Sequence, residues 1–308
     1  MEQWRGTNPL NPNGLTTAEV KQHLTLGREP QAKLNLTNID PSLVFRQVWD
    51  ASGDPRTSTD SAAYEYTSHS DISGTVVTAT FTNLKNSYYV DNNGRKQTIS
   101  KIVRNFTNLK KLPVENEALL SIYEDPTDGF WYNNSNEITV TDTYYDANGQ
   151  AIYIDGNGWL AATSLNAVYG GANEAQTLSG TPAHVETVRP IQGGTSYALA
   201  GSSISVHSDG SLYADKSNTA TIMQNGEPDP AFTKAGVSTW PDGKLSWDAK
   251  GPNEYYGAGL IKLTGSSITM NFKSTITWNG TVWATLSTII PQTPTPEYNV
   301  PSELLGHK

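Results

Sequence analysis

The sequence predicts an all-β protein, and three observations support that class. Thr, Ser, Asn and Gly are abundant, whereas long helical periodicity is nearly absent, which is typical of short strands joined by turns. Hydrophobic residues make up only 36% of the chain, but eight Trp, fifteen Tyr and six Phe supply bulky core side chains. Asn-Gly and Asp-Gly steps recur between alternating segments and favour tight turns. At 308 residues, the chain is long enough for one large domain or two smaller ones.

The two ends of the chain are predicted to lie outside the globular body. Residues 1–14 have the composition of an irregular arm. Residues 291–301 contain four prolines, which favour an extended, stiff spacer. We therefore expect one domain over residues 15–290 and a Pro-rich linker over residues 291–308 that leads to a following region.

Local patterns predict the elements inside the body. Thr16 to Glu19 resembles an N-cap, and it predicts a short helix that runs through Val20 and Leu24. Turn chemistry stands at four places, which are Asp91–Gly94, Asp146–Gly149, Ser208–Gly210 and Pro241–Gly243.

Alternation of apolar and polar residues predicts the strands. It is clearest in Thr75–Thr82, where Val77, Ala79 and Phe81 would share the core face. Ile99–Phe106 and Glu137–Tyr145 alternate in the same way. The opposite face of the first segment would carry Val76, Thr78, Thr80 and Thr82.

Charge is segregated along the chain. The segment from Leu112 to Leu160 contains nine acidic residues and no Lys or Arg, whereas Arg95 to Lys111 contains six basic residues and no acid. The formal net charge is −9. Carboxylates among Trp, Tyr, Asn and Gly suit a cleft for a metal ion or a hydroxyl-rich ligand. The basic run would meet phosphates.

The sequence lacks the residues that several classes of function require. The chain has no cysteine, so disulfides and thiolate metal sites are excluded. This absence fits the exposed surface of a Gram-positive bacterium, and a cytosolic protein is the alternative. No segment approaches 18 consecutive apolar residues, so no transmembrane helix is expected. The five His residues are scattered, and neither HExxH, a G-x-S-x-G elbow nor a P-loop occurs.

A collinear set of segments resembles a known family. Ala79–Tyr89 and Ile99–Val103 are followed by Glu124–Gly129 and Tyr144–Gly149, and the set continues through Ala162–Asn166, Ala200–Ile204, Trp247–Asp248 and Tyr255–Gly259. In this order they resemble the variable domain of streptococcal antigen I/II adhesins. That family includes the glucan-binding protein C domain and the adhesin domain of enterococcal aggregation substances.

The resemblance implies a fold and a role. The fold would be a lectin-like β-supersandwich of two large antiparallel sheets with short helical excursions. The role would be that of a non-catalytic adhesin, extracellular and anchored to the cell wall through a region outside this fragment, with no membrane insertion by this segment. Implied partners are lipoteichoic acid, extracellular DNA, glucan and glycoprotein glycans, and some members hold calcium in the cleft. The insertion Val90–Gln97 and the acidic segment depart from the family pattern.

Three candidate sites follow. The turn with Glu124, Asp125 and Asp128 would supply oxygen ligands to calcium, or it is a capped turn with Asp125 as the cap. Sugar rings stack on aromatic side chains, so a glycan cleft is expected at Trp131, Trp247, Glu254, Tyr255, Tyr256 and Asn166, with Trp159 and Trp240 as further aromatic candidates. An anionic-polymer stripe is expected at Arg95, Lys96, Lys101, Arg104, Lys110 and Lys111, the alternative being a solvated β face.

The leading hypothesis is a polymer-binding adhesin domain that mediates cell aggregation, biofilm formation or host attachment, and that binds an anionic polymer in preference to a neutral glycan. One alternative is a glycoside hydrolase that pairs Glu124 with Glu137 or Asp142. A structural stalk domain is the other alternative. The resemblance favours binding without turnover.

Overall fold

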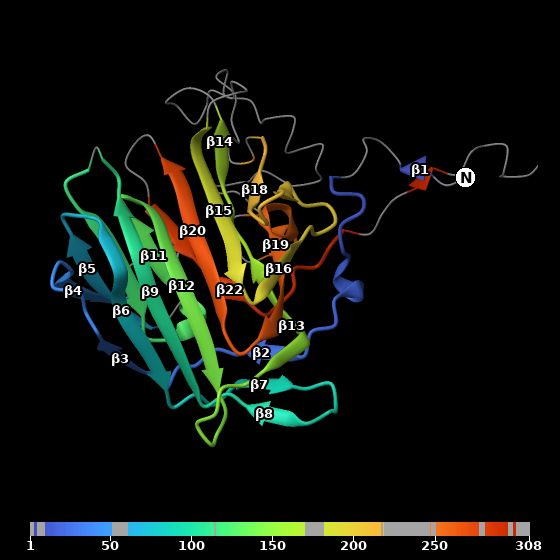
Figure 1. Ribbon diagram of the computed structural model, residues 1–308. Helices are drawn as coiled ribbons and strands as arrows, with labels where there is room; N and C mark the ends of the chain where they lie inside the picture. Colours follow the sequence, from blue (N-terminus) through green and yellow to red (C-terminus); the bar gives the residue numbers. More distant parts are fainter. Residues whose placement is uncertain are drawn as a thin grey trace, which may run out of the picture.

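A computed structural model describes residues 3–4, 10–50, 61–113, 115–169, 182–216, 218, 247, 251–276, 281–294 and 298–299. The all-β prediction is confirmed, because the described chain is built from antiparallel sheets with three short 3₁₀ turns (Figure 1). Those turns are η1 (Thr17–Glu19), η3 (Pro126–Asp128) and η4 (Glu254–Gly257). No helix in these ranges is long and apolar enough to cross a membrane.

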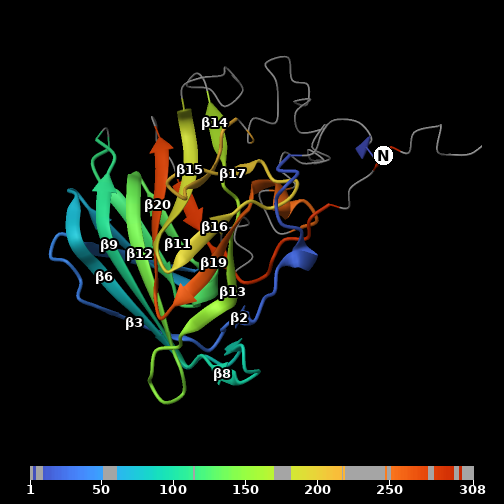
Figure 2. The same ribbon diagram turned by 45° about the vertical axis from the view of Figure 1, so that its right-hand side comes forward.

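The largest sheet has nine strands. Its order is β17 (Ile204–Val206), β18 (Leu212–Ala214), β15 (Pro182–Gln192), β20 (Ile268–Ile276), β12 (Ser135–Tyr145), β9 (Lys101–Lys111), β6 (Ile72–Thr82) and β3 (Lys33–Thr37), with β14 (Ala167–Tyr169) paired to β15. The central strands β6, β9, β12 and β20 lie side by side in both views of the ribbon (Figure 1 and Figure 2).

Four smaller sheets complete the fold. One has five strands, β21 (Thr281–Ala284), β11 (Phe130–Asn133), β10 (Ala118–Tyr123), β5 (Ala62–Ser68) and β4 (Val44–Asp50). Another has four, β16 (Gly194–Tyr197), β19 (Gly259–Gly265), β13 (Ile154–Ala162) and β22 (Leu286–Ser287). A third joins β2 (Leu24–Leu26), β7 (Ser87–Val90) and β8 (Lys96–Thr98), and the last pairs β1 (Gln3–Trp4) with β23 (Tyr298–Asn299).

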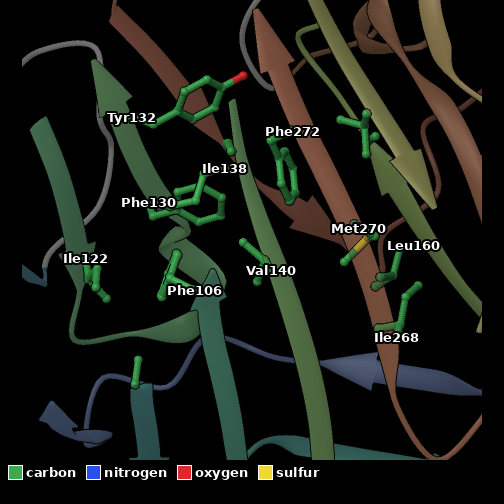
Figure 3. Close-up of a cluster of buried hydrophobic side chains, with 14 of the residues drawn as sticks. Phe106, Ile122, Phe130, Tyr132, Ile138, Val140, Leu160, Ile268, Met270 and Phe272 are labelled. Atoms are coloured by element: carbon green, nitrogen blue, oxygen red, sulfur yellow. The ribbon is translucent and has the colours of Figure 1, made fainter. Parts of the chain in front are cut away.

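The main core lies between the nine-stranded sheet and the two sheets that face it. Phe130 of β11 makes edge-to-face contacts with Phe106 of β9 and Phe272 of β20, each with ring centroids 5.1 Å apart (Figure 3). Leu263 of the four-stranded sheet is buried in the same cluster. The sandwich therefore has one long sheet on one side and two shorter sheets on the other.

The predicted alternation holds in the central strands. Val77, Ala79 and Phe81 of β6 are fully buried, as expected for the core face. Val76 is buried as well, because a register shift between Thr75 and Val77 inserts an irregularity into the pairing with β9.

The helix predicted after Thr16 is wrong in length. Thr16 and Glu19 do form a capping box, but the turn ends at Glu19. Leu24 instead begins β2 and pairs with Tyr89 of β7. The turns at Asp91–Gly94 and Asp146–Gly149 are confirmed, whereas Pro241–Gly243 lies outside the described residues.

A second apolar cluster covers the outer side of the four-stranded sheet. Trp159, Leu199 and Leu260 are buried there, and Leu15, Val20 and Ile290 pack against them. Beyond Ile290 the chain still contacts the body, since the Thr17 hydroxyl donates to the Pro291 carbonyl at 2.8 Å and the Thr293 N–H donates to the Thr17 hydroxyl at 2.8 Å. The first residues of the predicted linker thus lie against η1.

Candidate functional site

The β7–β8 hairpin presents the first two cations of the basic run. One carboxylate oxygen of Asp91 accepts hydrogen bonds from the N–H groups of Asn93 and Arg95, each at 2.9 Å. The bond from Arg95 is the largest cause that lowers the pKa of Asp91. Gly94 has φ of 78°, which a residue with a side chain rarely adopts. This rigid turn holds Arg95 and Lys96 exposed to solvent.

Two lysines at this end of the sandwich lie over tyrosine rings. The Lys96 ammonium is 4.3 Å from the centroid of Tyr88, and that of Lys101 is 4.5 Å from the centroid of Tyr145. Within the described part of the chain, neither lysine nor Arg95 forms an ion pair. We name Arg95, Lys96 and Lys101 the hairpin cations. They are available to bind an anion.

Arg104 does not belong to an exposed stripe, which corrects the sequence prediction. Its side chain is buried and forms a two-pronged ion pair with Asp142 of β12, at 2.9 and 3.0 Å. Its third nitrogen donates to the Pro126 carbonyl at 3.3 Å. Burial works against the charge, but the Asp142 carboxylate outweighs it and raises the pKa of Arg104. This guanidinium holds η3 against the sheet.

The sequence did contain a signal for the burial of Arg104. Residues of one parity on a strand share one face, and Arg104 has the parity of the buried residues Ile102 and Phe106. Lys101 has the opposite parity, so its predicted outward direction is confirmed.

The last two cations of the predicted stripe lie at the other end of β9 and have partners. Lys110 forms an ion pair with Glu137 at 3.2 Å. The Lys111 ammonium donates to the carbonyls of Leu112 and Glu115, at 2.8 and 2.6 Å. The six predicted cations therefore do not form one continuous stripe.

The carboxylates predicted to bind calcium are held by protein donors. Asp125 accepts hydrogen bonds from the Thr127 N–H at 2.9 Å and, on its other oxygen, from the Glu29 N–H at 2.9 Å. Asp128 accepts from the Ser61 hydroxyl, and Glu124 accepts from the Tyr64 hydroxyl at 2.9 Å. Asp125 is thus the N-cap of η3, which is the capped-turn alternative.

These residues fit a calcium ion poorly. Among the described residues, no three His, Asp or Glu side chains gather so as to hold a metal. A calcium ion needs six to eight oxygen ligands, and its binding here would displace the donors that occupy Asp125 and Asp128. Calcium at this turn stays a prediction that the geometry does not favour.

The predicted glycan cleft is divided between separate parts of the fold. Trp131 of β11 is buried, stacks on Trp283 with ring centroids 5.9 Å apart, and donates its indole N–H to the Tyr123 hydroxyl at 2.8 Å. That cluster is distinct from the one that contains Trp159, Trp247, Tyr255 and Tyr256. Trp240 lies outside the described residues.

Trp247, Tyr255 and Tyr256 serve as core side chains. Trp247 is fully buried and makes an edge-to-face contact with Tyr256, with ring centroids 5.6 Å apart. A Cβ at Gly257 would lie 2.2 Å from the Trp247 ring. The glycine thus admits a core indole where the sequence prediction expected a ligand.

The polar members of the predicted cleft also have structural positions. Asn166 donates its backbone N–H to Glu186 at 3.0 Å, and Glu254 stands in the first turn of η4. The carboxylates of the hydrolase alternative are separated as well. Asp142 faces the core beside Arg104, whereas Glu137 has the opposite parity on β12 and faces outward. Glu124, the predicted partner of either one, accepts from the Tyr64 hydroxyl. Both oxygens of Asp142 accept from Arg104, and Glu137 pairs with Lys110, so each of these carboxylates already has a partner in the protein.

Comparison with known proteins supports the same fold. The glucan-binding protein C family model matches residues 8–287. The chain is similar to the solved glucan-binding protein C of Streptococcus mutans, with 22% identity, a TM-score of 0.58 and coverage of 90% of this chain and 81% of that one. It is also similar to the adhesin domain of PrgB from Enterococcus faecalis bound to DNA, with 16% identity, a TM-score of 0.64 and coverage of 92% and 98%.

A second structure of the PrgB adhesin domain gives 14% identity, a TM-score of 0.56 and coverage of 89% of this chain and 91% of that one. At such identities the likeness to solved structures supports the fold. The family match extends over most of the chain and confirms the resemblance predicted from the sequence. The protein belongs to the glucan-binding protein C family.

Proposed function

We propose that this protein is a non-catalytic, polymer-binding domain of an adhesin on the surface of a Gram-positive bacterium. Its principal ligand is an anionic polymer, such as extracellular DNA or lipoteichoic acid. Binding of this kind would mediate cell aggregation, biofilm formation or host attachment. The observation that carries the proposal is the set of unpaired hairpin cations on a protein of net charge −9.

The positions of the acidic side chains between Leu112 and Leu160 support the proposal. Asp125, Asp128 and Asp142 are buried and bonded within the protein. Asp155 accepts the Tyr89 hydroxyl, and burial together with this hydrogen bond raises the pKa of Tyr89 to about 12. Asp146 accepts the N–H groups of its own turn. These five of the nine acidic side chains of this segment are therefore held by hydrogen bonds or an ion pair within the protein, whereas Arg95 and Lys96 are exposed to solvent.

The similar proteins are consistent with a polymer ligand. The PrgB adhesin domain has been solved bound to DNA, and the streptococcal protein carries glucan binding in its name. An anionic ligand is favoured for this chain because its predicted aromatic platform is buried, whereas Arg95 and Lys96 are exposed and Lys101 is half-buried on an outward-facing position.

A neutral glycan is the second candidate, and one observation favours it. The Asn166 side-chain carbonyl and the Ser274 hydroxyl are buried without hydrogen-bond partners within the described residues. Ser274 pairs in register with Glu186, which contacts Asn166. Buried polar atoms of this kind usually have a partner. Asn166 is only half-buried, so a sugar hydroxyl would supply its partner, whereas Ser274 is fully closed to solvent.

Neutralising the hairpin cations tests the proposal. We expect the variant Arg95→Gln, Lys96→Gln, Lys101→Gln to bind labelled DNA and lipoteichoic acid much more weakly than the parent. For duplex DNA the slope of log affinity against log salt should fall by roughly three units, about one per lost phosphate contact. Fluorescence anisotropy at several salt concentrations measures both quantities.

The matched control is Lys21→Gln, Arg46→Gln, Lys262→Gln, which removes the same charge elsewhere. The ion pairs of Arg46 with Glu65 and Glu117 involve a half-exposed side chain, so their loss should cost little stability. Equal weakening by both variants would show that only net charge matters. If the parent protein binds α-glucan but neither DNA nor lipoteichoic acid, the ligand is the neutral glycan and the anionic-polymer proposal is wrong.

A further inference from the structure

The outward face of the nine-stranded sheet carries cations at its two ends. At the lower end in Figure 1, Lys33 of β3 pairs with Thr82 of β6, and the pairing of Phe81 with Ile102 places Thr82 beside Lys101. At the upper end, Glu137 of β12 lies between Lys273 of β20 and Lys110 of β9, with which it forms the ion pair described above, so these three side chains carry a net charge of +1. Lys33 and Lys273 are exposed, and both come from segments far from the basic run.

Between these ends the face is lined by hydroxyl and amide side chains. The register brings together one row of Asn35, Thr80 and Thr143, interrupted by the apolar Val103, and a second row of Thr37, Asn105, Thr141 and Thr269, in which Thr78 is buried. In a third row, Thr107 and Arg189 stand on either side of Thr139 and Asn271, which are buried, and the Asn271 amide donates to Glu137 and Thr139 within the protein. Thr and Asn side chains donate hydrogen bonds to phosphate oxygens without regard to base sequence.

The net charge of this face opposes that of the protein. Across β3, β6, β9, β12, β20 and β15, the outward positions carry Lys33, Lys101, Lys110, Lys273 and Arg189 against one carboxylate, Glu137. The positive area ends at the β17–β18 hairpin, which carries two carboxylates. Hydrogen bonds from Ser211 lower the pKa of Asp209, and Asp215 contacts His207. A cationic area on a protein of net charge −9 selects a polyanion.

The face is open, and its dimensions suit a duplex. In Figure 1 the sheet is seen from this side, and no described element crosses in front of β6, β9, β12 and β20. Lys101 and Lys110 are nine positions apart on β9, which spans roughly 30 Å at about 3.3 Å per residue. One helical turn of duplex DNA is about 34 Å. Cations at both ends would then meet phosphates about one turn apart.

We propose that double-stranded DNA lies across the outward face of the nine-stranded sheet, from Lys33 and Lys101 to Lys110 and Lys273. The hydroxyl and amide rows donate to its backbone between these contacts. This inference rests on the proposed function, because it extends the hairpin cations into one surface through Lys101. Rows of small hydroxyl and amide side chains, with the aromatic Tyr145 at one end, favour a duplex backbone over stacked single-strand bases.

The test is the variant Lys33→Gln, Lys273→Gln, whose two residues lie outside the basic run. We expect its slope of log affinity against log salt for duplex DNA to be about 1.8 units shallower than that of the parent, at about 0.9 per phosphate contact. The control Lys21→Gln, Lys262→Gln has the same net charge and should keep the parental slope. Equal slopes for the two variants would overturn the proposal.

A second variant places a charge in the middle of the face. Thr143 is half-buried and points outward, so Thr143→Glu introduces a carboxylate between the two cationic ends without entering the core. We expect duplex binding to fall at least tenfold while circular dichroism and the unfolding temperature stay near parental values. Unchanged duplex binding by this folded variant would contradict the proposal. A parent that binds lipoteichoic acid but not duplex DNA at low salt would also overturn it, whereas a parent that binds neither polymer would overturn the proposed function itself.

Discussion

Replacing Arg104 with Met should lower the free energy of unfolding by about 3–5 kcal/mol, because removal of one partner leaves a buried charge without compensation. The charge left without a partner is that of the Asp142 carboxylate, whose side chain is 2% exposed. Urea denaturation measures the loss. The variant should retain DNA binding under conditions where it is folded, since Arg104 does not reach the surface.

The double variant Arg104→Met, Asp142→Leu is the control for this pair. Replacing both partners of a buried ion pair by apolar residues of similar volume is often neutral or stabilising. We therefore expect the double variant to recover most of the lost stability. A cost below about 1 kcal/mol for Arg104→Met would be typical of an exposed ion pair, and it would contradict the buried position of Arg104.

Trp247→Ala should lower the free energy of unfolding by about 3–5 kcal/mol, the usual cost of truncating a buried aromatic side chain to Ala. Trp247 is fully buried and fills the space beside Gly257. Thermal or urea unfolding would show the loss.

Tyr153→Ala is the matched control, because Tyr153 is 58% exposed. Its truncation should change stability by no more than about 0.5 kcal/mol. The two outcomes separate a core residue from a ligand platform. If Trp247→Ala kept parental stability and lost glycan binding, Trp247 would be a binding residue and its assignment to the core would be wrong.

Local sequence patterns predicted the strands and turns that depend only on residues close together in the sequence. The alternation in β6 and β12 and the Asx turns at Asp91 and Asp146 depend on neighbouring residues, so they were visible in the chain. The helix after Thr16 failed because Leu24 pairs with Tyr89, a residue far along the sequence.

The same limit applies to the candidate site. The separation of basic and acidic residues along the chain predicted the hairpin cations, but it did not show which charged side chains are buried. Arg104 and Asp142 became an ion pair because β9 and β12 are neighbours in register. Lys33 and Lys273 join the basic run only through strand order, which no local pattern contained.

The most direct test of polyanion binding is the affinity of the unmodified protein for duplex DNA as a function of salt. Log affinity should fall linearly with log salt, with a slope of about −5 for some five to six phosphate contacts at about 0.9 each. Affinity should also depend little on base sequence. A slope near zero, or binding to neutral α-glucan that persists where DNA does not bind, would contradict the proposed function.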